Sequence, residues 1–141
     1  MTRINAFIPP AELSDKHLIA EHREIKRIPN MIKSGKAIVK DIPEKFTLGK
    51  GHVKFFYDKL SWLHTRYNQI YNECVKRGFN VQNYNPAFDG MDNSNILYSE
   101  YLKLYNDWLP NSDEVNRIRA IIRQRITDNN NRPKKVKPSV K

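Results

Sequence analysis

The chain has 141 residues, of which 39% are hydrophobic, and this predicts one globular domain with a single modest core. Its 25 Lys and Arg side chains outnumber 15 Asp and Glu, and the net charge of +10 favours a polyanionic partner such as nucleic acid, although basic surfaces also serve solubility. One cysteine excludes an internal disulfide framework and the apolar runs are too short to span a membrane, so we expect a protein of a reducing, cytoplasmic compartment.

The first predicted helix covers residues 14–28. Ser14 suits the N-cap position, and Asp15 places a negative charge at the positive end of the helix dipole. Pro29 lacks an amide hydrogen, so it marks the end of this helix or a kink in it. The glycines and prolines of residues 33–51 then predict a loop.

Residues 52–78 carry the strongest helical pattern in the sequence. Apolar side chains recur there at spacings of three and four, which places them on one stripe of a helix. The stripe consists of Val53, Phe56, Leu60, Leu63, Tyr67, Ile70 and Cys74. Gly78 suits the position just past the helix end, and residues 80–93 are predicted to be a loop.

Two further helices are predicted in the second half of the chain. Residues 94–108 show the spacing of a shorter helix, and residues 112–126 show that of a last helix with Ser112 as its cap. No segment alternates with a period of two, so the expected fold class is all-α, with three main helices and a shorter one. We divide the chain into a helical domain, residues 1–127, and a basic disordered tail, residues 128–141, which has too little apolar content to fold.

One side of the first predicted helix is polar. At 100° per residue, this side carries His17, Ala20, Glu21, Glu24 and Arg27, opposite Leu18 and Ile25. A solvated face with ion pairs one turn apart is the simpler interpretation of such a pattern. A pair of carboxylates beside a cation also suits a catalytic face, and both interpretations stay open at this point.

The N-terminus is the second candidate for chemistry. Aminopeptidases generally remove an initiator Met before a small residue, so we expect the α-amine of Thr2 to be free. The pKa of an α-amine is about 8, roughly two units below that of lysine, so a sizeable fraction is a neutral nucleophile at physiological pH. Such an amine forms an imine with a carbonyl-like carbon, for example C1′ of a base-modified or abasic nucleotide. A carboxylate such as Glu24 would then transfer protons at the sugar.

Four segments of the chain resemble the small pyrimidine-dimer DNA glycosylases, the phage-type endonuclease V family. These segments are MTRIN, HLIAEHREIKR, LGKGHVKFFYDKL and NECVKRGFN. The resemblance is close over residues 2–28 and 48–80, and it continues as spacing over residues 107–126. It implies an all-α domain whose N-terminal segment is threaded between helices near the active site. It also implies a DNA repair enzyme that combines glycosylase and abasic-site lyase activities.

The resemblance also implies roles for individual residues. Thr2 corresponds to the nucleophile, which forms an imine with C1′ before β-elimination cleaves the strand, and Glu24 corresponds to the catalytic carboxylate. The implied DNA-contacting residues are Arg3, His17, Arg23, Arg27 and Arg125. The implied partner is damaged double-stranded DNA, bound by a monomer without a metal or organic cofactor, in the cytoplasm, as for phage, viral or bacterial enzymes.

The sequence departs from the family pattern mainly at its C-terminal end. Well-known members end in an aromatic-rich tail that helps to recognise the lesion, whereas NNNRPKKVKPSVK contains no aromatic residue. His22 stands where a tyrosine is familiar, and residues 80–106 are longer and richer in tyrosine. These departures leave the lesion range open. The alternative functions are an abasic-site lyase without dimer specificity and a non-catalytic, basic DNA-binding helical module.

Overall fold

The computed structural model describes residues 2–89 and 96–131, and every regular element within them is helical, which confirms the all-α class. The helices are α1 (Asp15–Glu24), α2 (Arg27–Lys33), α3 (His52–Phe55), α4 (Leu60–Lys76), α5 (Tyr98–Leu102) and α6 (Ser112–Asn131). Two 3₁₀ turns, η1 (Pro10–Glu12) and η2 (Asn85–Phe88), lie between them. In the part of the chain that the structure describes, no helix has the length and apolar character needed to cross a bilayer.

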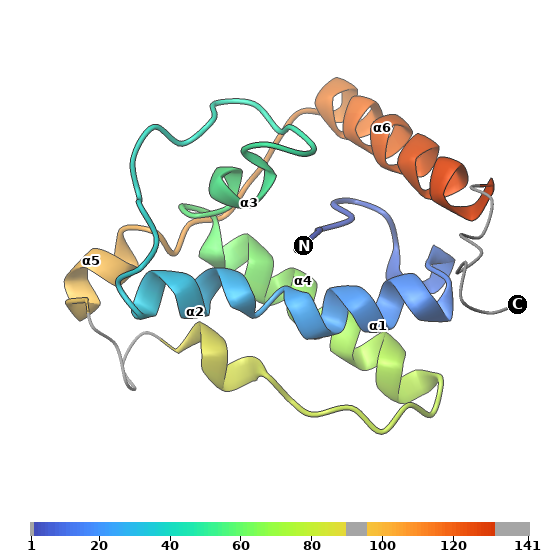
Figure 1. Ribbon diagram of the computed structural model, residues 1–141, viewed down its shortest axis with the longest axis horizontal. Helices are drawn as coiled ribbons and strands as arrows, with labels where there is room; N and C mark the ends of the chain where they lie inside the picture. Colours follow the sequence, from blue (N-terminus) through green and yellow to red (C-terminus); the bar gives the residue numbers. More distant parts are fainter. Residues whose placement is uncertain (1, 90–95, 132–141) are drawn as a thin grey trace, which may run out of the picture.

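Helix α4 is the element around which the others are arranged (Figure 1). It packs against α1, and the two 3₁₀ turns η1 and η2 also contact it. Helices α1 and α2 follow one another across α4, while α6 lies apart from them on the far side of the N-terminal segment (Figure 1). The N-terminal segment therefore runs between α1 and α6, as the family resemblance implies.

The apolar stripe predicted for residues 52–78 forms the centre of the core. Its members Phe56, Leu60, Leu63, Tyr67, Ile70 and Cys74 are all fully buried. Ile4, Ala6 and Ile8 of the N-terminal segment are buried in the same cluster. The beginning of the chain is thus part of the core, so its position is determined by packing as well as by hydrogen bonds.

The first predicted helix is divided into α1 and α2. Ser14 caps α1 as expected, because its side chain accepts a hydrogen bond from the backbone amide of His17. Pro29 lies in the first turn of α2 rather than at a helix end. In one continuous helix its ring would collide with the carbonyl of Ile25, and it has no amide hydrogen to donate there. The chain therefore ends α1 at Glu24 and begins α2 at Arg27.

The second predicted helix is also divided, into α3 and α4, and the cause lies far away in the sequence. The amide of Leu60 donates to the carbonyl of Leu104 (3.0 Å), and that of Trp62 donates to the carbonyl of Asn106 (3.3 Å). The first amides of a helix have no partner within the helix. The segment after α5 supplies these partners, and so it allows a new helix to start at Leu60.

Gly78 ends α4 as the sequence predicted. Its backbone has a φ of 83°, in the left-handed region, and its amide donates to the carbonyl of Val75 (2.9 Å). The amide of Phe79 donates to the carbonyl of Cys74 (3.0 Å), which completes a Schellman motif. Glycine is favoured at this position because a β-carbon makes the left-handed conformation costly.

The second half of the chain differs most from the prediction. Of the helix expected over residues 94–108, residues 94 and 95 lie outside the described residues, and the rest is reduced to α5. Trp108 packs instead against Phe7 and Phe55. Asn111 rather than Ser112 caps α6, because its side-chain oxygen accepts a hydrogen bond from the amide of Glu114 (2.8 Å).

Helix α6 is longer than expected and reaches Asn131, so it continues past the domain boundary predicted at residue 127. The remaining part of the predicted tail, residues 132–141, lies outside the described residues. Ile118 and Ile122 of α6 are fully buried, and they pack this helix onto the core.

Candidate active site

The N-terminal segment, residues 2–8, is held by side chains from four helices. Two backbone amides of the segment donate to side chains: Ile4 to Nε2 of His52 in α3 (2.9 Å) and Asn5 to Glu21 in α1 (3.2 Å). Two of its carbonyls accept from arginines: Ile8 from Arg66 in α4 (2.6 Å) and Phe7 from Arg119 in α6 (2.9 Å). Thr2 at the start of this segment is 9% exposed. The segment is thus fixed by hydrogen bonds from Ile4 to Ile8, and Thr2, two residues before this stretch, is buried.

His52 is a buried acceptor for this segment. Its Nδ1 lies 2.9 Å from the carbonyl of Thr47 and must donate to it, so the neutral ring keeps a lone pair on Nε2 for the amide of Ile4. Burial lowers the pKa of His52, and the charges of Arg125 and Arg3 lower it further, although the Thr47 carbonyl and Glu21 act in the opposite direction. The neutral form of His52 is therefore the one that suits this fold.

Glu21 is the most completely bonded side chain near the N-terminal segment. It accepts hydrogen bonds from the amide of Asn5 (3.2 Å) and from the Asn5 side chain (2.8 Å). Arg66 adds two more, from Nε (2.7 Å) and from Nη2 (3.2 Å). Both members of this ion pair are buried, with side chains 0% and 4% exposed for Glu21 and Arg66. The carboxylate of Glu21 therefore binds groups within the protein, namely Asn5 and Arg66.

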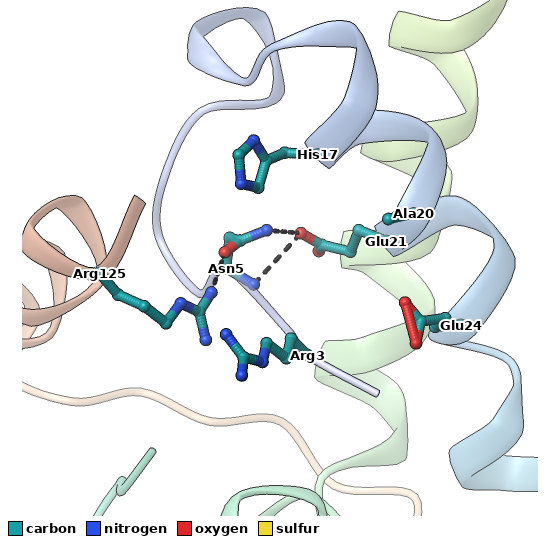
Figure 2. A pocket seen from close by; sticks show the side chains of 7 residues that line it. All are labelled: Arg3, Asn5, His17, Ala20, Glu21, Glu24 and Arg125. Atoms are coloured by element: carbon teal, nitrogen blue, oxygen red, sulfur yellow. Dashed lines mark hydrogen bonds between the residues drawn. The ribbon is translucent and has the colours of Figure 1, made fainter. Parts of the chain in front are cut away.

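A small cavity of about 80 Å³ lies between α1, α6 and the N-terminal segment (Figure 2). It is lined by Arg3, Asn5, His17, Ala20, Glu21, Glu24 and Arg125. Four of these residues come from α1, and they are four of the five that the helical period placed on its polar side. The polar side of the first predicted helix thus faces a pocket that the N-terminal segment and α6 complete.

Glu24 lies at the end of α1, and its side chain is 12% exposed. Arg27 Nη1 is 3.7 Å and Arg23 Nη2 is 4.0 Å from its carboxylate oxygens. These two arginines are 54% and 59% exposed, so both remain accessible to a large anionic ligand. They lie beside the cavity and do not line it.

Arg3 and Arg125 present their guanidinium groups across the cavity from Glu24 (Figure 2). Arg125 donates to the side-chain oxygen of Asn5, and its Nε is a buried donor that has no protein partner in the described part of the chain. Burial lowers the pKa of Arg125, and the charge of Arg3 lowers it further. Two neighbouring cations with an unused donor form a site that favours an anion such as phosphate.

His17 lines the cavity at the other end of α1. Its Nδ1 is 2.7 Å from the hydroxyl of Ser14, the capping residue of the helix. Burial lowers the pKa of His17, and the charges of Lys16 and Arg125 add to this effect. A neutral His17 has one ring N–H, and it can serve as a hydrogen-bond donor to a ligand without carrying a full charge.

Sequence reasoning missed the side chains that hold the N-terminal segment, namely Asn5, His52, Arg66 and Arg119. A signal existed for Arg66, because it falls beside Leu63 and Tyr67 on the apolar stripe of α4. A charged residue at such a position requires a buried partner. For the other three, the residue type alone gives no indication of a distant partner. Among residues 2–89 and 96–131, no group of three His, Cys, Asp or Glu side chains could hold a metal ion.

A comparison with protein-family models gives a match over residues 1–85 to the family described as pyrimidine dimer DNA glycosylase. The match includes α1 to α4, and hence every residue that lines the cavity except Arg125. It covers more than half of the 141 residues. The chain therefore belongs to the pyrimidine dimer DNA glycosylase family.

Proposed function

We propose that this protein excises cyclobutane pyrimidine dimers from duplex DNA and then cleaves the strand at the resulting abasic site. The observation that carries the proposal is the cavity, which combines the N-terminal segment, a carboxylate and two arginines in one place. The family membership supports a DNA glycosylase in general terms. The lyase step and the residues below are our proposal.

The proposed nucleophile is the α-amine of Thr2, which becomes available when Met1 is removed. The neutral amine attacks C1′ of the damaged nucleotide, and the glycosidic bond breaks with its electron pair going to the base. The nitrogen then loses a proton, and the C1′–O4′ bond opens with its electron pair going to O4′, which takes up a proton. The lone pair of the nitrogen forms the double bond to C1′, and this gives the imine. Thr2 directly precedes Arg3, which lines the cavity, and this supports a position for the amine close to the pocket.

Glu24 is the proposed proton-transfer group. Its carboxylate removes a proton from C2′ of the imine, and the released electron pair forms a double bond to C3′ as the 3′ phosphate leaves. Water then hydrolyses the imine and frees the enzyme. Arg23 and Arg27 are exposed beside Glu24, so they are accessible to the phosphates of a DNA strand that enters the site.

The remaining site residues are proposed to hold DNA. The exposed guanidinium groups of Arg23 and Arg27 suit phosphates on one side of Glu24, and Arg3 and Arg125 suit a phosphate inside the cavity. His17 would donate to the same strand. This binding surface needs neither a metal nor an organic cofactor, and one copy of the chain supplies all of it, so we propose a monomer on damaged double-stranded DNA.

A second candidate function is an abasic-site lyase without dimer specificity. It is favoured by the C-terminal residues 129–141, which contain no aromatic side chain that could stack on a lesion. Lysines there can hold phosphate, but phosphate contacts carry no information about the base. An abasic site needs only the amine, the carboxylate and the phosphate contacts, so this function would survive the loss of lesion recognition.

Borohydride trapping tests these functions, because borohydride reduces an imine to a stable amine. The protein is mixed with labelled duplexes that carry one pyrimidine dimer or one abasic site. We expect a crosslink with both duplexes, mapped by peptide sequencing to Thr2. A crosslink with the abasic duplex alone would establish the second candidate. Salt-dependent binding without any crosslink would leave a non-catalytic DNA-binding module.

A matched control moves the amine without changing the rest of the protein. A Gly inserted between Met1 and Thr2 also permits removal of Met1, but it shifts the free amine by one residue, about 3.5 Å. We expect this variant to bind the abasic duplex like the parent protein and to form far less crosslink. Equal crosslinking by the two proteins would contradict the assignment of the nucleophile.

A further inference from the structure

A buried ion pair connects the N-terminal segment to the helix that carries Glu24. The carboxylate of Glu21 binds both hydrogen-bond donors of Asn5, and Arg66 binds Glu21 and also the carbonyl of Ile8. The pair therefore holds the segment at two points, its middle residue Asn5 and its last residue Ile8. Glu21 and Glu24 line the same cavity from the same face of α1 (Figure 2).

We propose that Glu21 and Arg66 are positioning residues, which set the distance between the α-amine of Thr2 and the carboxylate of Glu24. This inference rests on the proposed function. Asn5 is three residues from Thr2, so a chain of at most about 11 Å joins the anchored amide to the amine. Glu21 and Glu24 are three residues apart on one helix, a rise of about 4.5 Å. The positions of the nucleophile and of the proton acceptor are thus both set relative to α1.

The two carboxylates of α1 have different environments, which supports different tasks. Four hydrogen bonds from Asn5 and Arg66 surround Glu21, and its side chain is 0% exposed. The side chain of Glu24 is 12% exposed, and the guanidinium groups of Arg27 and Arg23 lie 3.7 and 4.0 Å from its carboxylate oxygens. Pairs of carboxylates in unlike environments commonly divide their roles in this way. Glu21 holds the nucleophile's segment, while Glu24 faces the reacting sugar.

Stability alone gives a weak reason for a buried ion pair at this place. Removing two charges from water is costly, and apolar side chains of similar volume often replace such a pair without loss of stability. An apolar pair, however, would offer no acceptor to the two donors of Asn5 and no donor to the carbonyl of Ile8. The specific effect of Glu21 and Arg66 is therefore the placement of the segment.

Asn5 extends the same network toward the DNA-binding side of the cavity. Its side-chain amide donates to Glu21 (2.8 Å), and its side-chain oxygen accepts from Arg125. The position of the amine is therefore coupled to a cation that we propose for phosphate binding. His52 fixes the adjacent residue, Ile4, through its amide (2.9 Å). With Glu21, these contacts leave little freedom to the chain between Asn5 and Thr2.

The test separates the rate of imine formation from DNA affinity. Single-turnover borohydride trapping on an abasic duplex is measured at saturating protein, and the dissociation constant of the duplex is measured separately. The main variant is Glu21→Met/Arg66→Met, which removes one charge of each sign and leaves the net charge unchanged. Glu21→Gln is the second variant. Circular dichroism and urea unfolding show whether each is folded.

We expect trapping by the double variant to be slower by about 10–100-fold, because a misplacement of about 1 Å can cost two orders of magnitude in rate. The dissociation constant should stay within about threefold. The control is Glu73→Gln, which breaks the ion pair between Glu73 of α4 and Arg77, the residue just after this helix; neither lines the cavity. We expect its trapping rate to equal that of the parent protein.

The outcomes distinguish this inference from the proposed function. If the parent protein forms no imine, the proposed function fails. If the parent protein forms the imine and the folded double variant forms it at the same rate, the positioning role is overturned and the proposed function stands. The Glu73→Gln control could show an equal decrease in trapping rate, or both Glu21 variants could fail to fold. Either result would show that the Glu21–Arg66 pair acts on stability, and it would also overturn the positioning role.

Discussion

Replacement of Glu24 by Gln is the sharpest test of the proposed chemistry. Gln has nearly the same size and shape as Glu, so packing at this position, which is 12% exposed, should be retained. The variant loses the negative charge of the carboxylate and, with it, the ability to accept a proton in the transition state. A positioned acid or base typically contributes about 10²–10⁴-fold to a rate. We therefore expect the single-turnover rate of strand cleavage at an abasic site to decrease by this factor.

DNA affinity should respond differently to the same change. Arg27 and Arg23 lie 3.7 and 4.0 Å from Glu24, and both are more than half exposed. Attraction between such charges is worth about 1 kcal/mol at most, because water screens it. Loss of the carboxylate leaves both guanidinium groups to phosphates. Binding of Glu24→Gln should therefore equal that of the parent protein or be tighter by up to about fivefold.

The assay uses two duplexes with the same sequence. One has a natural abasic site for single-turnover cleavage, and the other has a stable abasic analogue for binding by fluorescence anisotropy. Glu44→Gln is the matched control, because Glu44 is exposed in the loop before α3 and its loss changes the net charge equally. Cleavage by Glu24→Gln at the parental rate would refute the role of this carboxylate, and slower cleavage by Glu44→Gln would show a general effect of charge.

Three further predictions concern binding and stability. Arg27→Ala should weaken duplex binding and reduce the slope of log affinity against log salt by about 1, as a titration at several salt concentrations would show; an unchanged slope would exclude a phosphate contact. Because the folded state lowers the pKa of His52, the free energy of unfolding should be highest above the ordinary histidine pKa, about 6.5, and decrease as the pH falls through it. The variant His52→Gln keeps an acceptor for the amide of Ile4 but has no titrating ring. Urea unfolding at several pH values should therefore show a smaller decrease in this variant than in the parent protein, and an equal decrease in the two proteins would assign the effect to other groups. Gly78→Ala should cost about 1 kcal/mol in urea unfolding, because φ is 83° there while no atom within 4 Å would meet the new β-carbon; no loss of stability would contradict the conformational argument.

Local patterns in the sequence determined the helical fold class and one face of the candidate site. The period of 3.6 residues placed His17, Glu21 and Glu24 on one side of a helix, and they line one cavity in the structure. The N-cap at Ser14 and the helix end at Gly78 were equally predictable. These features depend on interactions within a few residues, so the information for them lies in neighbouring positions.

The tertiary structure alone decided where the long predicted helices divide and what holds the N-terminal segment. Helix α4 begins at Leu60 because a carbonyl more than 40 residues later, at Leu104, accepts its amide. Asn5 is fixed by Glu21, which in turn requires Arg66 from another helix. Each such contact joins residues that are distant in the sequence, and a buried donor or acceptor can be satisfied by many types of side chain. A single sequence therefore shows that partners are needed, and packing selects which residues they are.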